Sequence, residues 1–240
     1  MFVIDFHSHI LPEIDDGSSS IEMSEAMLQM SCEQGVNVQV LTPHFYASRM
    51  NVNDFFMRRD EAIARLQPIA QRLGIKLRVG AEVAFFNNIG SSEVLERFAV
   101  SGSKVILIEM PFMQWTDKVI DEIKAIVDRG FFPMIAHIER YFSYQYNKEP
   151  MKRLLVMKRV LFQVNCESLT HVLKRGTILR TLDESVFVLG TDAHNLTSRR
   201  PNLIDGRKYI SDKCGANQLD SMDKVGNILL GYAKLRRTDK

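Results

Sequence analysis

The sequence lacks the features that mark secreted, membrane-spanning or cysteine-bridged proteins. It contains only three cysteines, Cys32, Cys166 and Cys214, and this odd, scattered set excludes a disulfide framework and a cysteine-rich zinc site. No apolar run approaches the ~18 residues that a membrane span needs. The first residues also lack the basic segment that opens a signal peptide. We therefore expect a cytoplasmic protein without membrane insertion.

An excess of charge of one sign is also missing. The formal net charge is only +2, because 31 lysines and arginines nearly balance 29 aspartates and glutamates. Such a balance gives no electrostatic reason to expect a nucleic-acid partner. With 240 residues, of which 45% are hydrophobic, the chain is long enough to bury a core in one domain without disulfides.

Apolar segments alternate with segments of helical periodicity along the chain. The expected strands cover residues 2–6, 36–42, 76–83, 104–110, 132–136, 161–165 and 185–190. Helices are expected after a capping box at 19–22, from Asp54 to Leu73, at 117–129, 151–159 and 177–183, and at about 215–235. Continuous apolar strands such as 105–108 are typical of a parallel sheet covered by helices. The pattern predicts an α/β fold, a closed or nearly closed (β/α) barrel of seven units in a single domain.

Histidines and acidic residues follow most of these strands. They are His7, His9, His44, Glu82, Glu109, His137, Asp192 and His194, and of the six histidines only His171 lies elsewhere. The C-terminal ends of parallel strands share one face of a barrel, and that face builds the active sites of barrel enzymes. We therefore expect these side chains to converge at one rim.

Two of these positions are pairs separated by one residue. His7 and His9 lie on the same side of an extended backbone, because strand side chains alternate with period two. Asp192 and His194 offer a carboxylate and an imidazole in the same arrangement. Each pair can therefore approach one metal ion.

The acidic residues support the same interpretation. A carboxylate such as Glu82 or Glu109 at the end of a buried strand is costly unless it is paired or ligated. In the first loop, Asp15 and Asp16 either form an Asx turn or supply one carboxylate to the cluster. Imidazoles and carboxylates without thiolates suit manganese, iron or zinc in a catalytic role. Nine or ten such groups would hold up to three ions, and multinuclear sites of this kind cleave phosphate esters.

Arginines and aromatic residues follow two of the histidines. Arg140 lies three residues after His137, and Arg199 and Arg200 follow His194. Guanidinium groups bind phosphate in a bidentate manner, so these three are candidate substrate ligands, with a solvated surface position as the alternative for Arg200. Tyr141 and the other rings of 141–146 either flank a flat substrate or cover the barrel rim.

Six segments together resemble one family. They are 6–12, 15–17, 42–44, 80–82, 137–141 and 191–195, which read FHSHILP, DDG, TPH, GAE, HIERY and TDAHN. The family is the manganese-dependent protein-tyrosine phosphatases of bacterial capsule and exopolysaccharide operons, within the polymerase and histidinol phosphatase (PHP) superfamily. The resemblance runs from Met1 to about Pro201. It implies a distorted (β/α)7 barrel that hydrolyses phosphotyrosine, with the C-terminal tail of a bacterial tyrosine autokinase as the protein partner.

The resemblance also implies up to three metal ions, with Mn²⁺ expected and iron or zinc as alternatives. By position, the first ion takes His7, His9, Glu82 and Asp192, the second takes Glu82, Glu109 and His137, and the third takes Asp16, His44 and His194. Arg140 and Arg199 correspond to the phosphate-binding arginines.

Two positions depart from the family pattern. Ile138 stands where a proline usually follows the histidine, and Arg199-Arg200-Pro201 stands where one arginine usually precedes prolines. Other functions also remain open from the sequence. A small-molecule phosphatase, such as one for histidinol phosphate, fits the same barrel, and a non-catalytic metal-binding regulator of a kinase would need fewer ligands. A phosphodiesterase or exonuclease would be expected to carry a basic stripe.

Overall fold

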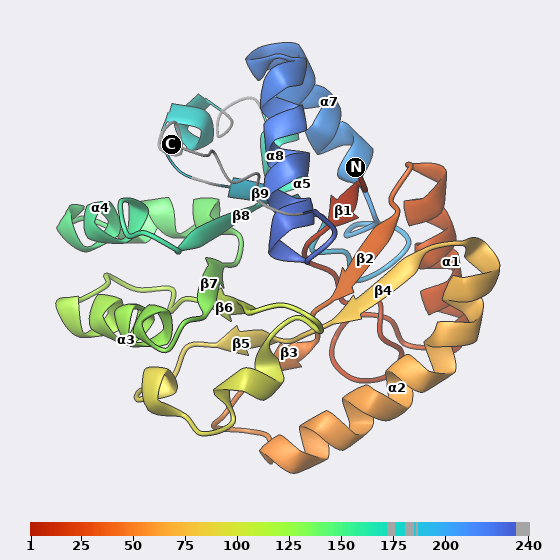
Figure 1. Cartoon of the computed structure of the whole chain (residues 1–240), viewed down its shortest axis with the longest axis horizontal. Coiled ribbons are helices and arrows are strands. Elements are labelled where there is room, and N and C mark those ends of the chain that lie inside the picture. The colour runs from red at the N-terminus through yellow and green to blue at the C-terminus, as the bar shows by residue number, and fades with distance from the viewer. Residues whose placement is uncertain (172–175, 181–184, 186, 234–240) are drawn as a thin grey trace.

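The computed structural model places the strands at the centre of the molecule and the helices around them (Figure 1). The structure describes residues 1–171, 176–180, 185 and 187–233. The strands are β1 (Ile4–Asp5), β2 (Val38–Leu41), β3 (His44–Phe45), β4 (Lys76–Val79), β5 (Glu82–Ala84), β6 (Val105–Glu109), β7 (Phe132–Ile135), β8 (Leu161–Asn165) and β9 (Phe187–Gly190). The helices are α1 (Ile21–Glu33), α2 (Val52–Leu73), α3 (Asp117–Asp128), α4 (Glu149–Leu155), α5 (Cys166–Thr170), α7 (Leu203–Cys214) and α8 (Ala216–Leu229), with 3₁₀ helices η1 (Ile89–Ser91), η2 (Leu95–Phe98) and η3 (Ile138–Tyr144).

The strands form two parallel sheets, in the orders β1-β2-β4 and β3-β5-β6-β7-β8-β9. Backbone hydrogen bonds continue the pairing between the sheets. Gly80 N donates to Leu41 O at 2.9 Å, and Glu82 N donates to Pro43 O at 3.0 Å. As a result β3 continues the line of β2, and β5 continues that of β4. The expected strand at 76–83 is divided at Gly80, where a Cβ would lie only 3.1 Å from Val100.

The first and last strands also lie side by side. Phe6 N donates to Leu189 O at 3.2 Å, and Ser8 forms a parallel bridge with Ala193. The buried Asp5 carboxylate reinforces this seam, because it accepts from Thr191 Oγ1 at 2.6 Å. The seven strand positions, with the lines β2–β3 and β4–β5 each counted once, therefore follow the distorted (β/α)7 arrangement expected from the sequence.

Two helices begin at residues other than those expected. Ser20 is the N-cap of α1, and its hydroxyl accepts from Met23 N at 3.2 Å. The third residue after this cap is Met23 and not Glu22, so the capping box expected at 19–22 is wrong. The N-cap of α2 is Asn51, whose side chain accepts from Asp54 N at 3.3 Å, so the expected cap at Asp54 is wrong by one turn.

The C-terminal helices differ most from the expectation. The sequence pattern does not predict α7, because one of its buried positions is Gly206, which gives no apolar signal and packs against Cys166. The closing helix is α8, and it ends before the predicted limit of about 235. The predicted helix at 177–183 lies partly outside the described residues, of which 176–180 are helical. None of the helices within the described ranges is both long and apolar enough to cross a membrane.

The two faces of the larger sheet carry different kinds of side chain. One face carries the register partners Phe45, Val83, Ile108, Ile135 and Phe162, which are buried in the main apolar cluster. Helix α3 supplies Ile120, Ile123 and Ile126 to that same cluster. Because strand side chains alternate, the opposite face is free to carry polar groups.

Candidate metal centre

Strand register brings the predicted site residues together on that opposite face. His44 pairs with Glu82 across β3 and β5, and Glu82 pairs with Leu107 across β5 and β6. Register partners point to the same face, and so do residues two apart on one strand. His44, Glu82 and Glu109 therefore share one surface of three neighbouring strands.

Glu82 lies at the middle of the cluster and is fully buried. Its Oε2 lies 3.0 Å from His44 Nδ1, 3.2 Å from His7 Nε2 and 3.3 Å from His9 Nε2. Its Oε1 lies 2.9 Å from His137 Nε2. One carboxylate thus touches four imidazoles, two that follow β1, one in β3 and one that follows β7.

Asp192 forms a second anionic point on the other side of His7 and His9. Its Oδ1 lies 3.6 Å from His7 Nε2 and 3.5 Å from His9 Nε2. Two guanidinium groups also reach it, Arg140 Nη2 at 2.6 Å from Oδ2 and Arg199 Nη2 at 2.8 Å from Oδ1. Both arginines therefore lie at the cluster that the acids and histidines form.

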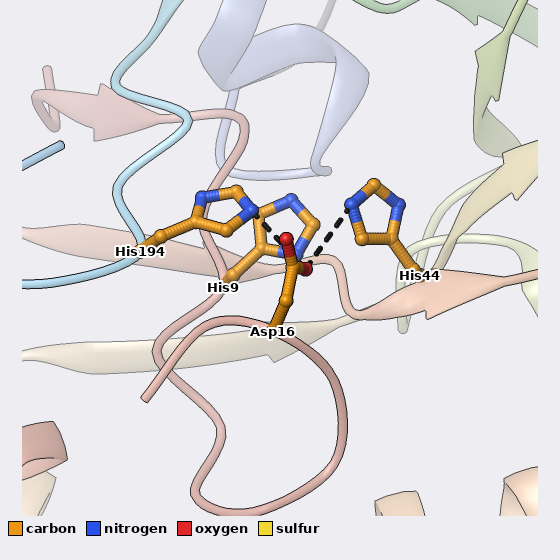
Figure 2. Close-up of side chains that lie close together, drawn as sticks. All are labelled: His9, Asp16, His44 and His194. Atoms are coloured by element: carbon orange, nitrogen blue, oxygen red, sulfur yellow. Dashed lines mark ion pairs between the residues drawn. The ribbon is translucent and has the colours of Figure 1, made fainter. Parts of the chain in front are cut away.

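The outer part of the cluster is shown in Figure 2. Asp16 Oδ1 lies 3.5 Å from His44 Nε2 and 3.5 Å from His194 Nε2, and His9 lies beside both imidazoles. The Asp16 side chain is 65% exposed, whereas His9 and His194 are buried. This group therefore faces solvent through Asp16 and faces the interior through His9.

Glu109 and His137 complete the ring of side chains. Glu109 Oε1 lies 3.7 Å from His137 Nε2. Burial, together with the nearby Glu82 carboxylate, raises the pKa of Glu109 to about 7. The Tyr141 hydroxyl lies 3.2 Å from His137 Nδ1 and so holds the far side of that imidazole.

Several nitrogen and oxygen atoms of the cluster that could bind a metal have no hydrogen-bond partner. Within the described part of the chain, Glu82 Oε2, His44 Nδ1 and His194 Nε2 are buried and unpartnered, because the short contacts around them lack hydrogen-bond alignment. A buried group left in this state costs about 1–3 kcal/mol. Bound cations would offer these atoms partners, and the nitrogen and oxygen donors suit manganese, iron or zinc. The residues present therefore fit a multinuclear metal site.

Three overlapping groups bring their donor atoms within 4.8 Å of one another: His9, Asp16, His44 and His194; His7, His9 and Glu82; and His44, Glu82 and Glu109. Sharing of His9, His44 and Glu82 among the groups means that ions held there would be close neighbours.

The electrostatics of the cluster are dominated by its acids. Burial alone would lower the pKa of His9, but the Asp15 and Glu82 carboxylates raise it to about 10. Burial would likewise raise the pKa of Asp192, yet His7 and His9 hold it well below its usual range. The imidazoles thus sit in a field of negative charge that favours a bound cation.

Comparisons with known proteins agree with this geometry. A family model for capsular polysaccharide synthesis, CpsB/CapC, matches residues 3–227. The chain belongs to the CpsB/CapC family.

Curated relatives cover almost the whole chain. It is 29% identical over 233 residues to the tyrosine-protein phosphatase CpsB of Streptococcus pneumoniae, an alignment that covers 90% of this chain and 93% of the relative. It is 24% identical over 229 residues to the tyrosine-protein phosphatase YwqE of Bacillus subtilis, covering 92% and 88%. The family expected from the sequence motifs is therefore confirmed.

Solved structures show the same fold. Structures of YwqE from Bacillus subtilis and CpsB from Streptococcus pneumoniae, described as unique metal-dependent tyrosine phosphatases, match with a TM-score of 0.81 at 21% identity and cover 97% of this chain and 96% of theirs. A chain of archaeal ribonuclease P with mature tRNA matches with a TM-score of 0.61 at 15% identity, covering 99% and 96%. At these identities the likeness establishes the PHP-type fold, and function has to be argued from the site.

In this CpsB/CapC chain, most of the predicted site residues lie together. The nine predicted ligands are within one connected cluster, and Arg140 and Arg199 both contact Asp192. Arg200 is exposed and is not among the residues that reach Asp192. Tyr141 is fully buried behind His137, its ring packs in the core and its hydroxyl contacts His137 Nδ1; its role as a substrate contact stays a prediction.

Sequence reasoning missed two residues that contact the cluster, and it left the roles of Asp15 and Asp16 open. Asp15 Oδ2 lies 2.7 Å from His9 Nδ1, while its neighbour Asp16 faces the outer group. Gln163 and Asn165 of β8 contact His7 and Asp192. A signal for the last two was present, because polar residues with period two on an otherwise apolar strand indicate a polar face.

Proposed function

We propose that this protein is a metal-dependent protein-tyrosine phosphatase. The observation that carries the proposal is the cluster of imidazoles and carboxylates around Glu82, with two guanidinium groups on the adjoining Asp192. The names of the family's relatives support the same activity. The proposed substrate is phosphotyrosine on a bacterial tyrosine autokinase that regulates capsule or exopolysaccharide synthesis, and the proposed location is the cytoplasm.

We assign the ligands to three ions, with Mn²⁺ as the proposed metal. The first ion takes His7, His9, Glu82 and Asp192, the second takes Glu82, Glu109 and His137, and the third takes Asp16, His44 and His194. When bound, such ions supply Lewis acidity and a nucleophile at neutral pH. The chain itself supplies the spacing of the donors and the removal of bulk water, since most of the donors are buried.

Arg140 and Arg199 are assigned to binding the phosphate. Their side chains are 37% and 35% exposed, so both are partly open to solvent while they contact Asp192. A phosphate offers the guanidinium groups more acceptor oxygens than one carboxylate. The leaving phenolate has a pKa of ~10 in free tyrosine, so it needs less protonation than an alkoxide would.

Replacing Arg199 and Arg200 in turn tests which of these two neighbouring arginines binds phosphate. We expect Arg199→Ala to lower kcat/KM by about 10- to 150-fold, the loss of a charged hydrogen bond of about 1.5–3 kcal/mol. Arg200→Ala should change kcat/KM by less than about twofold, because surface substitutions are nearly neutral. Steady-state kinetics on both variants decide the matter, and a larger loss in Arg200→Ala would reverse the assignment.

Two rings at the rim support an aryl substrate. Phe112 is 44% exposed and stacks on His137, with ring centroids 6.1 Å apart and an interplanar angle of 19°. Tyr46 packs on His44 with centroids 5.2 Å apart. Burial, with Glu109 and Glu82 close by, raises the pKa of Tyr46.

Phe112→Ala should reduce the preference for aryl esters. A ring pair contributes about 0.5–1.5 kcal/mol, so we expect kcat/KM for a phosphotyrosine peptide to fall by about 2- to 13-fold. The low rate on a phosphoserine peptide should not change. Tyr146→Ala is the matched control, since that ring is 89% exposed. Equal losses on both peptides would show that Phe112 has no part in ring recognition.

The substrate class is tested by a direct comparison. The purified protein is assayed on a phosphotyrosine peptide, a phosphoserine peptide and histidinol phosphate, each with Mn²⁺ and with a chelator. We expect the tyrosine peptide to be hydrolysed with the highest kcat/KM and only in the presence of metal. A higher value for histidinol phosphate would identify a small-molecule phosphatase instead.

A further inference from the structure

Strand β8 contributes two buried amides to the site. Gln163 and Asn165 lie two residues apart and so point to the same face of the strand, and both are buried. Neither is a metal ligand in the assignment above. Each nevertheless contacts one of the assigned ligands directly.

The orientation of the Gln163 amide is fixed by a backbone group. His137 N donates to Gln163 Oε1 at 2.7 Å, and a backbone N–H can only donate, so the oxygen must face it. The same oxygen lies 2.9 Å from His7 Nδ1. A carbonyl oxygen can only accept, and therefore His7 Nδ1 carries the proton.

This tautomer determines which ring nitrogen of His7 offers a lone pair to the cluster. In the neutral ring with its proton on Nδ1, the lone pair is on Nε2, which faces Glu82 Oε2 at 3.2 Å and His9 Nε2 at 3.1 Å. His9 is held in the same way, because its Nδ1 lies 2.7 Å from the acceptor Asp15 Oδ2. A bound cation requires both rings to be neutral, and in that state the two Nδ1 contacts turn both Nε2 lone pairs toward one point.

The amide chain continues from Gln163 to Asp192. Gln163 Nε2 donates to Asn165 Oδ1 at 2.8 Å, which leaves Asn165 Nδ2 to donate to Asp192 Oδ2 at 2.9 Å. Each hydrogen bond in this series, from His137 N through the two amides to Asp192, therefore has only one possible direction. Asp192 Oδ1 remains turned toward His7 and His9.

The neighbouring strand β9 leaves room for the Gln163 and His7 side chains. A Cβ at Gly190 of β9 would lie 2.7 Å from His7 Cβ and 2.8 Å from Gln163 Nε2. Only glycine therefore allows β9 to pass both side chains. His137 has φ 31°, a strained value for a residue with a side chain, and the bond from its N–H to Gln163 stabilises that turn.

We propose that Gln163 and Asn165 are positioning residues that fix the His7 tautomer and the Asp192 carboxylate for metal binding. This inference rests on the proposed metal centre but not on the identity of the substrate. Partners of this kind change metal affinity by about 10- to 100-fold when they are removed. Gln163 contacts His7 and its orientation is fixed independently by His137 N, whereas Asn165 is the amide that contacts Asp192, so the two have separable effects.

The first measurement is Mn²⁺ affinity by titration calorimetry on the full chain. Gln163→Met keeps the shape of the side chain and removes its polar atoms, and we expect it to bind the tightest Mn²⁺ about 10- to 100-fold more weakly. Gln39→Met is the matched control, since it also removes a buried amide that donates to a carboxylate, Asp5 Oδ2 at 2.8 Å. Unchanged affinity in a folded Gln163→Met variant would overturn the proposal.

The second measurement follows the His7 ring itself. In the protein loaded with Zn²⁺, which permits NMR, we expect a slowly exchanging His7 Nδ1–H resonance. It should be lost in Gln163→Met but kept in Gln163→Glu, which retains an acceptor, and in Asn165→Ala. If Gln163→Met does not fold, the other two variants decide. Loss of the resonance in Asn165→Ala or in Gln163→Glu would contradict the proposal that the Gln163 oxygen fixes the His7 tautomer. A wild-type protein that binds Mn²⁺ as expected but hydrolyses no phosphotyrosine would refute the proposed function and leave this inference standing.

Discussion

Glu82→Gln should lower kcat/KM by about 10³-fold or more. The substitution keeps the size of the side chain but removes the charge that four imidazoles share. Metal ions contribute several kcal/mol to stabilising a phosphoryl transition state, and about 4 kcal/mol corresponds to a factor of 10³. Because one carboxylate is assigned to two ions, its loss should disturb both at once.

The measurement combines kinetics with metal content by elemental analysis. We expect the Glu82→Gln variant to retain less bound metal than wild type and to keep its helical circular dichroism. Glu93→Gln provides the control, because that carboxylate is exposed and should show wild-type values for both. A variant that keeps its full metal content and activity within tenfold of wild type would remove Glu82 from the centre of the site.

The convergence of the ligands could be predicted from the sequence because parallel strands impose it. His44, Glu82 and Glu109 each follow a recognisable apolar segment, and strand register then places them on one face. The rule needs no knowledge of loops or of packing. It therefore identified eight of the nine ligand candidates, all except Asp16 in the first loop, although they are spread from His7 to His194.

Loops and aromatic packing follow no such rule. Asp15 and Asp16 are adjacent, yet one contacts His9 Nδ1 from behind and the other faces the outer group. No periodicity distinguishes them, because a loop has no fixed alternation of side chains. The burial of Tyr141 likewise depends on Phe112 and Trp115, which pack against its ring from the segment after β6.

The divided strand shows a third limit. Residues 76–83 read as one strand, but the strand is broken at Gly80, where Val100 packs so closely that a Cβ would lie 3.1 Å from its side chain. That contact joins residues about 20 positions apart in the chain. Its consequence is functional, since the break separates β4 from β5 and leaves Glu82 at the start of a strand in the larger sheet.

Removal of metal should abolish activity and also destabilise the fold. A ligand present at 100 times its Kd stabilises a protein by about 2.7 kcal/mol, and in a chain of this size each kcal/mol shifts Tm by about 2–4 °C. We therefore expect a chelator to lower Tm by about 5–11 °C for each site that empties. Addition of Mn²⁺ should restore both Tm and turnover.

Two histidine variants show whether this shift comes from the cluster. His9→Ala should have no turnover, should remain folded, and should lose a smaller part of its Tm on chelation, because one ligand group is already incomplete. His171→Ala should respond like wild type, since its side chain is 59% exposed and lies 3.8 Å from Glu167 rather than at the cluster. If chelation left the Tm and turnover of wild type unchanged, the buried and unpartnered atoms of Glu82, His44 and His194 would need a partner other than a metal. If instead all three proteins lost the same Tm, the ion would be bound elsewhere than at His9.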